Sequence, residues 1–267
     1  MARARASVIR ALLPALALFG LFGSGLLHTA LLGTSPGAWA ALASPPLVAT
    51  GLFTVGYSLA SALGAVVVGT ALALALLPRG EGRSPARASR VWLALPPVTV
   101  GFLVVLVLGS TGFLPALLAP FTGGLAFPSP VRSSSGAGIV VAAMLKESAF
   151  VVLWVRGSLD RLDPRLVPTA RLLGARPWQV FREVLAPVVM PSATVAGLIA
   201  FLYALGAWEL PFLLGPSDPQ ALSLFVLDAR DHGEPFDRAV AAAALTVLAL
   251  VSALVGWWAL RLQRRLE

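Results

Sequence analysis

Three charged side chains inside long apolar runs are the residues of this sequence best placed to act on a solute. Lys146 and Glu147 are adjacent within one run, and Glu209 lies near the end of another. Ionisable groups at membrane depth are costly unless they are paired or hydrated, so each is a candidate functional residue. Because neighbouring helical residues point about 100° apart, we expect Lys146 and Glu147 not to neutralise each other side by side. Two interpretations stay open: an interhelical ion pair, for example Lys146 with Glu209, or a solute path that these side chains line.

The other residues offer little for catalysis. The sequence has no cysteine, which excludes disulfides, thiol catalysis and thiolate metal sites. His28 and His232 are the only histidines, and neither an HExxH nor a GxSxG motif occurs. Asp231 beside His232 is a poor candidate for a metal or acid–base pair. The phosphate loop GxxxxGK[ST] is missing as well, so the sequence predicts a non-enzymatic chain with no metal, ATP or other cofactor of its own.

The elements that must position these charges are membrane helices. Hydrophobic residues make up 58% of the chain and charged residues only 12%, and several apolar runs exceed the roughly 20 residues that cross a bilayer. The first run is too long for a cleavable signal peptide, whose apolar part has about 7–15 residues. We therefore predict an all-α integral membrane protein with about six transmembrane helices, at Ala11–Leu32, Leu47–Leu77, Val91–Ser110, Gly138–Val155, Val188–Leu214 and Ala239–Leu260.

Small residues and prolines predict details of these spans. Gly56, Ala60 and Gly64 recur every fourth residue and are expected to form a ridge against a neighbouring helix. Pro96 and Pro97 are expected to kink the third span. The segment 111–137 is broken by four prolines, so we expect an outer loop without a helix of spanning length.

The distribution of charge predicts the topology. Cytosolic segments of membrane proteins carry an excess of Lys and Arg, and a cytosolic N-terminus places 16 of the 20 basic residues on the inner side. The loop 216–238 is acidic and falls outside. Both termini are therefore expected in the cytosol, together with the longest polar interval, Arg156–Pro191.

This polar interval has the pattern of two short amphipathic helices. Apolar residues recur at three- and four-residue spacing, which is the period of a helix with one apolar face. Gly174 separates the two pieces, and Pro177 stands where a second helix can begin. The sequence predicts a helix, a bend and a second helix, with an apolar stripe formed by Leu166, Val167, Ala170, Leu173, Trp178, Phe181, Val184 and Leu185.

The order of residues in the interval resembles a motif of the permease subunits of binding-protein-dependent ABC importers. That motif reads E-A-A-x-x-x-G and continues as L-G-A-x-x-W-x-x-F-x-x-V-x-L-P-x-x-x-P. Pro168 and Thr169 replace its opening Glu and Ala, so a salt bridge made by that Glu cannot form here. The candidate coupling residues are Pro168, Thr169, Ala170, Leu173, Gly174, Ala175, Trp178 and Phe181, and the match continues through Val184, Ala186, Pro187 and Pro191.

The resemblance implies the type I importer fold and a set of partners. In that family the bent helix docks on a separate ATPase subunit at the cytosolic face, which binds ATP and Mg. The chain would form half of the translocation pathway in a bacterial inner membrane. It would pair with a second permease copy or a related permease and receive a small solute from an extracytoplasmic binding protein. No nucleic acid partner is implied.

The resemblance also implies a layout of the chain. Residues 1–267 would form one transmembrane domain, with the first span and an outer connector in 1–46 and the permease core in 47–260. Within the core, 156–187 would be the cytosolic ATPase-coupling loop. The stretch Gly206–Gly215 resembles the branch that handles polyamines, ferric iron, thiamine and phosphonates. The alternative from the residues alone is a secondary carrier driven by an ion gradient, since such carriers also use midplane charges and broken helices.

Overall fold

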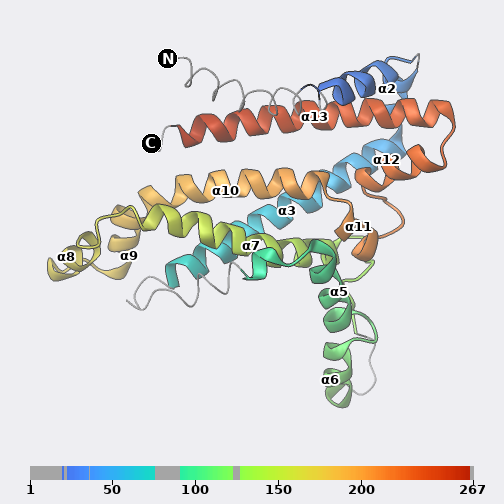
Figure 1. Ribbon diagram of the computed structural model, residues 1–267. Coiled ribbons are helices and arrows are strands. Elements are labelled where there is room, and N and C mark those ends of the chain that lie inside the picture. Colours follow the sequence, from blue (N-terminus) through green and yellow to red (C-terminus); the bar gives the residue numbers. More distant parts are fainter. Residues whose placement is uncertain (1–19, 21–22, 36, 76–90, 123–126, 265–267) are drawn as a thin grey trace, which may run out of the picture. The chain divides into compact units, whose positions relative to one another are not determined.

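Every regular element in the described part of the chain is helical. The computed structural model describes residues 20, 23–35, 37–75, 91–122 and 127–264. Helices satisfy their own backbone groups, which a lipid environment requires. Figure 1 shows α2 (Ala38–Leu42), α3 (Pro45–Ala75), α5 (Pro97–Leu108), α6 (Phe113–Thr122), α7 (Ala137–Leu159), α8 (Leu166–Leu172), α9 (Pro177–Val180), α10 (Ala186–Gly206), α11 (Glu209–Leu214), α12 (Leu222–Asp231) and α13 (Pro235–Gln263), with the π-helical turn η1 (Phe181–Leu185) between α9 and α10.

Five helical stretches among these residues are long and apolar enough to cross a membrane. They are Pro45–Ala75, Pro97–Phe121, Ala137–Leu159, Pro177–Gly206 and Pro235–Gln263. Half of the expected first span, Ala11–Leu32, lies outside the described residues, and residues 23–32 are helical. The all-helical membrane architecture is thus confirmed for the five later spans.

The chain divides into two compact units. Unit 1 comprises residues 1–48 and 225–251, and unit 2 comprises residues 49–224 and 252–267. In unit 1, α2 packs on the first half of α13 through Ala38 and Ala243, both fully buried. A Cβ on Gly33 would lie 3.0 Å from the backbone nitrogen of Ala243, so this glycine allows a close approach of backbone to helix.

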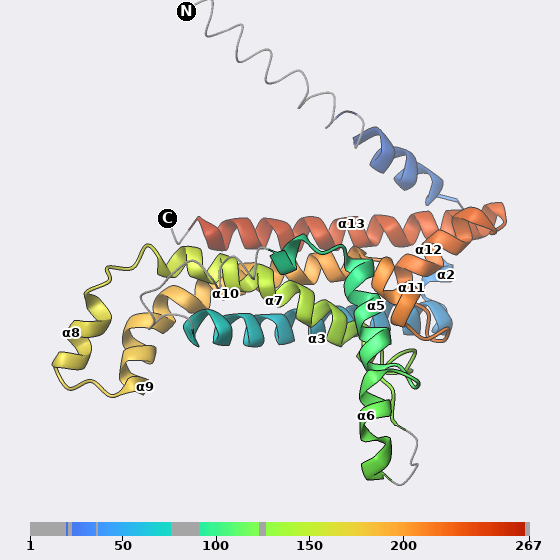
Figure 2. The same ribbon diagram turned by 60° about the horizontal axis from the view of Figure 1, so that its bottom comes forward.

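In unit 2, α7 is the central helix. Of its spanning window 61% is buried, against 33% or less in each of the other four spans. Helix α10 lies along it and α3 crosses it obliquely, whereas α5 and α6 follow each other in a line near its other end (Figures 1 and 2). One apolar cluster joins α3, α5, α7 and α11 around Ile139 and Leu210, and a second joins α3, α7 and α10 around Val151 and Val189.

Close packing of α3 on α7 depends on a glycine one turn beyond the predicted ridge. A Cβ on Gly69 would lie 2.6 Å from the Cβ of Val151 and 2.7 Å from the carbonyl oxygen of Ser148. A Cβ on Gly64 would meet Met144 of α7, whereas a Cβ on Gly56 would meet nothing within 4 Å among the described residues, and Ala60 is exposed. The predicted ridge was therefore wrong in two of its three members, because the buried face of α3 is rotated away from them.

One prediction about the third span was wrong. Pro96 and Pro97 do not kink a continuous helix. Instead the chain breaks at Leu95–Pro96, and Pro97 begins α5, where a missing N–H costs nothing. Segment 111–137 was expected to lack a helix of spanning length, and the helix that its described residues contain, α6, has ten residues. α6 follows α5, so that the stretch long enough to span is Pro97–Phe121. The turn at Gly109–Gly112 absorbs the break between the two helices.

The outer end of the fifth span is interrupted as well. α10 ends at Gly206, Ala207 is extended, and α11 begins at Glu209, so the expected helix Val188–Leu214 is two helices. The polar loop 216–238 contains α12, and the last span begins at Pro235, four residues before its predicted start. A Pro at a first helical turn needs no hydrogen bond, so Pro235 suits that place.

Candidate functional site

The bend at Gly174 is built by a standard helix stop signal. Gly174 has φ +83°, a left-handed conformation that glycine adopts without a steric penalty. The Ala175 N–H donates to the Ala170 carbonyl (3.0 Å) and the Gly174 N–H donates to the Arg171 carbonyl (3.0 Å). These two bonds are the Schellman pattern that closes a helix. The predicted helix, bend and second helix are present.

The second helix begins and continues through its prolines. Pro177 is the first residue of α9, and the Arg176 N–H donates to the Gln179 Oε1 (2.8 Å). The chain then widens into the π turn η1 before α10. Pro187 has no N–H for the carbonyl four residues earlier, and its ring crowds that carbonyl. A wide turn at Phe181–Leu185 accommodates this, in line with the usual place of such turns beside helix irregularities.

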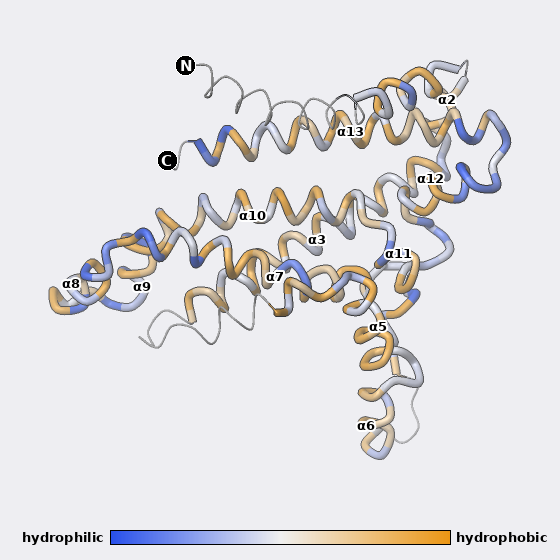
Figure 3. The backbone as a smooth tube through the Cα atoms, viewed as in Figure 1, coloured by the Kyte–Doolittle hydropathy of each residue, from blue (hydrophilic) through white to orange (hydrophobic). Residues whose placement is uncertain are grey.

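Residues 166–185 present apolar side chains that nothing in the described chain covers. Leu172 and Leu173 are 88% and 83% exposed, and Trp178 is 65% exposed although its ring lies 5.5 Å from that of Phe181. α8 and α9 lie beside each other at the end of α7 and the start of α10 (Figure 1), and hydrophilic stretches surround them (Figure 3). We call residues 166–185 the α8–α9 hairpin. It combines a rigid bend with an uncovered apolar surface.

The eight candidate coupling residues fall together in this hairpin. Pro168, Thr169 and Ala170 occupy the middle of α8, and Ala170 is partly buried while the other two are exposed. Trp178 lies in α9 and Phe181 opens η1. The replaced motif residues, Pro168 and Thr169, thus lie in an intact helix. The change removes a charge without breaking α8.

Two of the three charged candidates form an ion pair with each other, and Glu209 is not part of it. Lys146 and Glu147 are both buried in α7, and the Lys146 Nζ lies 3.4 Å from the Glu147 Oε1. The prediction that these neighbours do not pair was wrong, because the long lysine side chain bends back to reach the adjacent carboxylate. The Lys146 Nζ also lies 5.0 Å from the ring centroid of Tyr203 on α10. The ammonium is therefore held between a carboxylate and an aromatic face.

Glu209 makes a different contact. It is partly buried at the start of α11, where its Oε2 accepts a hydrogen bond from the Trp208 N–H (3.2 Å). Across the ranges that the structure describes, it makes no ion pair within 4.0 Å. The suggested Lys146–Glu209 pair is therefore absent from this conformation, and Glu209 instead satisfies a backbone N–H at a helix start.

Hydroxyl groups of α3 add polarity beneath the apolar surface. Tyr57, Ser58 and Ser61 are all almost fully buried, and the Ser61 hydroxyl donates to the Tyr57 carbonyl (2.7 Å). The Thr54 hydroxyl accepts from the Leu222 N–H (2.9 Å) and so ties the start of α12 to α3. These contacts favour a role in helix packing.

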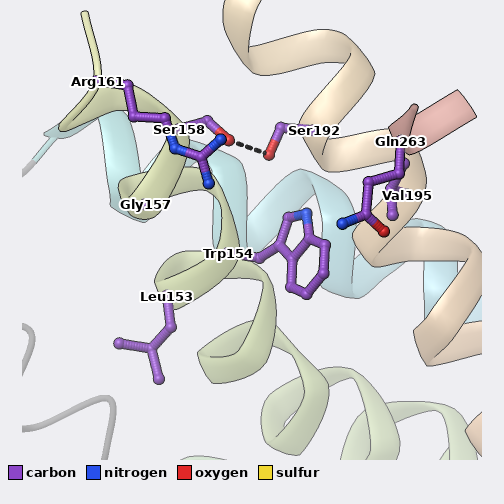
Figure 4. A pocket seen from close by; sticks show the side chains of 8 residues that line it. All are labelled: Leu153, Trp154, Gly157, Ser158, Arg161, Ser192, Val195 and Gln263. Atoms are coloured by element: carbon purple, nitrogen blue, oxygen red, sulfur yellow. Dashed lines mark hydrogen bonds between the residues drawn. The ribbon is translucent and has the colours of Figure 1, made fainter. Parts of the chain in front are cut away.

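Tyr203 and a polar cavity at the foot of α7 were missed by sequence reasoning. Tyr203 lies in an ordinary apolar run, and nothing in its spacing indicates the contact with Lys146. The cavity is lined by residues from α7, from the chain just after it, from α10 and from α13 (Figure 4). Because its members are separated by as many as 110 residues, from Leu153 to Gln263, only the tertiary structure assembles it.

Comparison with known families gives one clear match. Residues 86–267 match the family described as "Binding-protein-dependent transport system inner membrane component". A curated relative is the "Molybdenum transport system permease protein ModB" of Escherichia coli K12, which is 29% identical over 177 residues, covering 64% of this chain and 74% of that protein. The protein of the same name from Azotobacter vinelandii is 28% identical over 149 residues, covering 56% and 63%.

Solved structures share the fold. A chain from a bacterial ABC transporter that imports the acidic polysaccharide alginate superposes with a TM-score of 0.80 at 20% identity, covering 99% of this chain and 97% of that one. A chain from the MetNI methionine ABC transporter, in an inward-facing conformation, superposes with a TM-score of 0.57 at 18% identity, covering 84% and 99%. At these identities the likeness concerns the fold alone.

Proposed function

The chain belongs to the family of inner membrane components of binding-protein-dependent transport systems, and from this premise we propose that it imports a small tetrahedral oxyanion of the molybdate kind. It is the permease subunit of an ABC importer and is itself non-catalytic, with ATP hydrolysis on a separate ATPase subunit. The observation that carries the coupling part of the proposal is the α8–α9 hairpin. It offers uncovered leucines and a tryptophan on a rigid bend, at the junction of two spanning helices.

The hairpin is proposed as the docking element for the ATPase. Aromatic and leucine side chains that seat in a partner's groove supply most of the energy of such interfaces. Leu172, Leu173 and Trp178 have the required exposure. The charge distribution supports a cytosolic position for the hairpin, with both termini on the same side. ATP-driven motion of the ATPase would then reach α7 and α10 directly.

The complex is proposed to contain a second permease subunit and a periplasmic binding protein. One solved relative is described in complex with an alginate-bound periplasmic protein. In this chain, α3 exposes large apolar side chains such as Leu52, Leu59 and Leu63, which suit lipid or a neighbouring permease. A single chain of this size provides one half of a transmembrane pathway.

The substrate proposal replaces the branch expected from Gly206–Gly215. That stretch suggested polyamines, ferric iron, thiamine or phosphonates, whereas relatives from four organisms named in the comparisons carry the name of a molybdenum transport system. Molybdenum in neutral water is the molybdate dianion. Lys146 is a buried cation on the central helix, close to Tyr203 and neutralised by Glu147 in this conformation. A change of side-chain conformation that moves the Lys146 ammonium away from Glu147 would free an anion-attracting group.

Uptake by a reconstituted complex tests the proposal. The permease, its ATPase and its binding protein are placed in proteoliposomes, and accumulation of radioactive molybdate is measured with ATP inside. We expect ATP-dependent uptake that survives collapse of the ion gradients and that excess molybdate or tungstate competes away. Uptake that needs the gradient instead would support a secondary carrier. Competition by spermidine but not by molybdate would restore the polyamine branch and refute the oxyanion substrate.

A further inference from the structure

The foot of α7 holds a cavity with no role in the transport path described above. Its volume is about 250 Å³, and it is lined by Leu153, Trp154, Gly157, Ser158, Arg161, Ser192, Val195 and Gln263. This is slightly smaller than the roughly 300–1,000 Å³ of sites that hold drug-sized ligands. The cavity therefore suits a compact group rather than a large molecule. We call it the Arg161 cavity.

Three hydrogen-bond donors border this cavity and make no side-chain hydrogen bond within the part of the chain that the structure describes. In the close-up view the guanidinium of Arg161, the indole of Trp154 and the side-chain amide of Gln263 all border the same space (Figure 4). Within the described ranges, Arg161 has no carboxylate within 4.0 Å. Ser158 and Ser192 share a hydrogen bond of 2.7 Å at its edge, and Ser192 is only 1% exposed. A guanidinium with indole and amide donors nearby recognises the oxygens of an anion.

Part of the cavity wall is apolar. Leu153 and Val195 supply aliphatic surface, and the Trp154 indole adds aromatic surface. A free inorganic ion has no apolar atoms that could pack against these side chains. A phosphodiester with an attached glycerol or alkyl group places its charge on the donors and its carbon atoms on the apolar side. One guanidinium also matches the single charge of a phosphodiester.

The residues around Gln263 mark the depth of the cavity in the membrane. Trp257 and Trp258 are 47% and 64% exposed, and the Arg261 guanidinium lies 3.8 Å from the Trp257 ring centroid. Exposed tryptophans and arginines at the end of a spanning helix are characteristic of the level of lipid headgroups. Gln263 follows Trp258 by about 7.5 Å along the helix axis. The cavity therefore lies at headgroup level, beside the chain that leads into the hairpin.

We propose that the Arg161 cavity binds the phosphate group of an anionic phospholipid, seated between the end of α7, α10 and the end of α13. A free phosphate shares the recognising chemistry but leaves the apolar wall unused. A bound headgroup would hold the end of α13 against α7 next to the start of the hairpin. The position of the hairpin relative to α7 and the end of α13 would then depend on the fraction of anionic lipid in the membrane.

Native mass spectrometry of the purified full-length chain tests the site without any transport partner. Phosphatidylglycerol, phosphatidylcholine and inorganic phosphate are titrated separately. We expect one tight phosphatidylglycerol site, and Arg161→Gln should weaken it about tenfold, the loss of one hydrogen bond to a charged group. Gln263→Leu keeps the side-chain size and should weaken binding less. Arg165→Gln removes the same charge nearby, outside the cavity, and should leave binding unchanged.

Each possible result either supports or refutes the proposed phospholipid site. Equal binding of phosphatidylglycerol and phosphatidylcholine, or equal weakening by Arg161→Gln and Arg165→Gln, would overturn the site. Arg161-dependent binding of inorganic phosphate without phosphatidylglycerol would support an anion site but refute the lipid as its occupant. Because the measurement uses the chain alone, failure of the oxyanion-transport proposal leaves this result unaffected, and the reverse also holds.

Discussion

At the scale of single residues, the buried charges and the tightest glycine contacts govern the middle of the molecule. Lys146 and Glu147 neutralise each other on the most buried helix. Removing one partner of a buried pair leaves an uncompensated charge, whereas replacing both with apolar residues is often tolerated. Single and double substitutions can therefore distinguish a contribution of the Lys146 charge to transport from a contribution of the Lys146–Glu147 pair to stability.

Lys146→Met and Glu147→Gln should each destabilise the chain, and the double variant should recover most of the loss. We expect each single change to cost about 3–5 kcal/mol, measured as a lower midpoint of thermal unfolding in detergent. If Glu147→Gln alone is as stable as the natural chain, the pair is not structural. Uptake by the stable double variant then reports whether the lysine charge serves the solute.

Gly69→Ala should loosen α3 from α7. The added methyl would meet Val151 and the Ser148 carbonyl, both on α7, at under 3 Å, and overpacking of this kind costs about 1–3 kcal/mol. Gly56→Ala is the matched control, since a Cβ there meets nothing within 4 Å. The midpoint temperature of thermal unfolding should fall for Gly69→Ala and should stay equal or rise for Gly56→Ala. The reverse order would contradict the packing described for α3.

At the scale of elements, the α8–α9 hairpin combines local stop signals with an uncovered surface. Its two helices are short, and helices of this length are marginal by themselves. The Schellman bonds at Gly174 and the proline start at Pro177 fix their relative direction. The hairpin therefore keeps its bend before any partner arrives.

Gly174→Val should distort the bend without blocking membrane insertion. No neighbour lies within 4 Å of a Cβ there, so the cost comes from the backbone: the left-handed conformation costs a non-glycine residue about 1–2 kcal/mol. We expect ATP hydrolysis by the complex to continue while molybdate uptake falls several-fold. Gly256→Val, at an open position on α13 with an ordinary backbone, is the control. Normal uptake by Gly174→Val would argue against a rigid coupling bend.

Replacing Leu172 and Leu173 with Ser should weaken association with the ATPase. Both side chains are more than 80% exposed, so the folded chain loses little packing. Each leucine that becomes buried on docking contributes about 1.5–3 kcal/mol, which predicts at least tenfold weaker binding for the double variant. The measurement is co-purification of the ATPase at graded concentrations, with unchanged thermal unfolding of the permease as the control. Unchanged binding of the ATPase to the double variant would show that it docks on another surface of the chain.

At the scale of the whole molecule, the sequence predicts the existence of the membrane helices better than their boundaries. The apolar runs and the glycine–proline signals of residues 166–187 are local, so the later spans and the bent hairpin follow from them directly. The break at Ala207, the start of α5 at Pro97 and the rotated face of α3 depend on tertiary packing. The contact of Lys146 with Tyr203 and the Arg161 cavity join distant residues, which one sequence does not reveal.

The orientation can be tested because the natural chain has no cysteine. Thr169→Cys in α8 and Ser217→Cys after α11 both create exposed, single labelling sites. A membrane-impermeant maleimide added to intact cells stripped of their outer membrane should label Ser217→Cys and spare Thr169→Cys until the membrane is opened. The opposite pattern would invert the topology and remove the hairpin from the ATP side.

The hydrogen bond between Ser158 and Ser192 has a mechanical meaning. It joins the helix that leads into the hairpin to the helix that leaves it, at the point where both reach the headgroup level. Because this bond joins its two ends, the chain between Ser158 and Ser192 should move as one rigid unit, and not as a flexible connection between two independent helices. A force applied to the α8–α9 hairpin would therefore rotate α7 and α10 together. The buried Lys146–Glu147 pair on α7 would move with them.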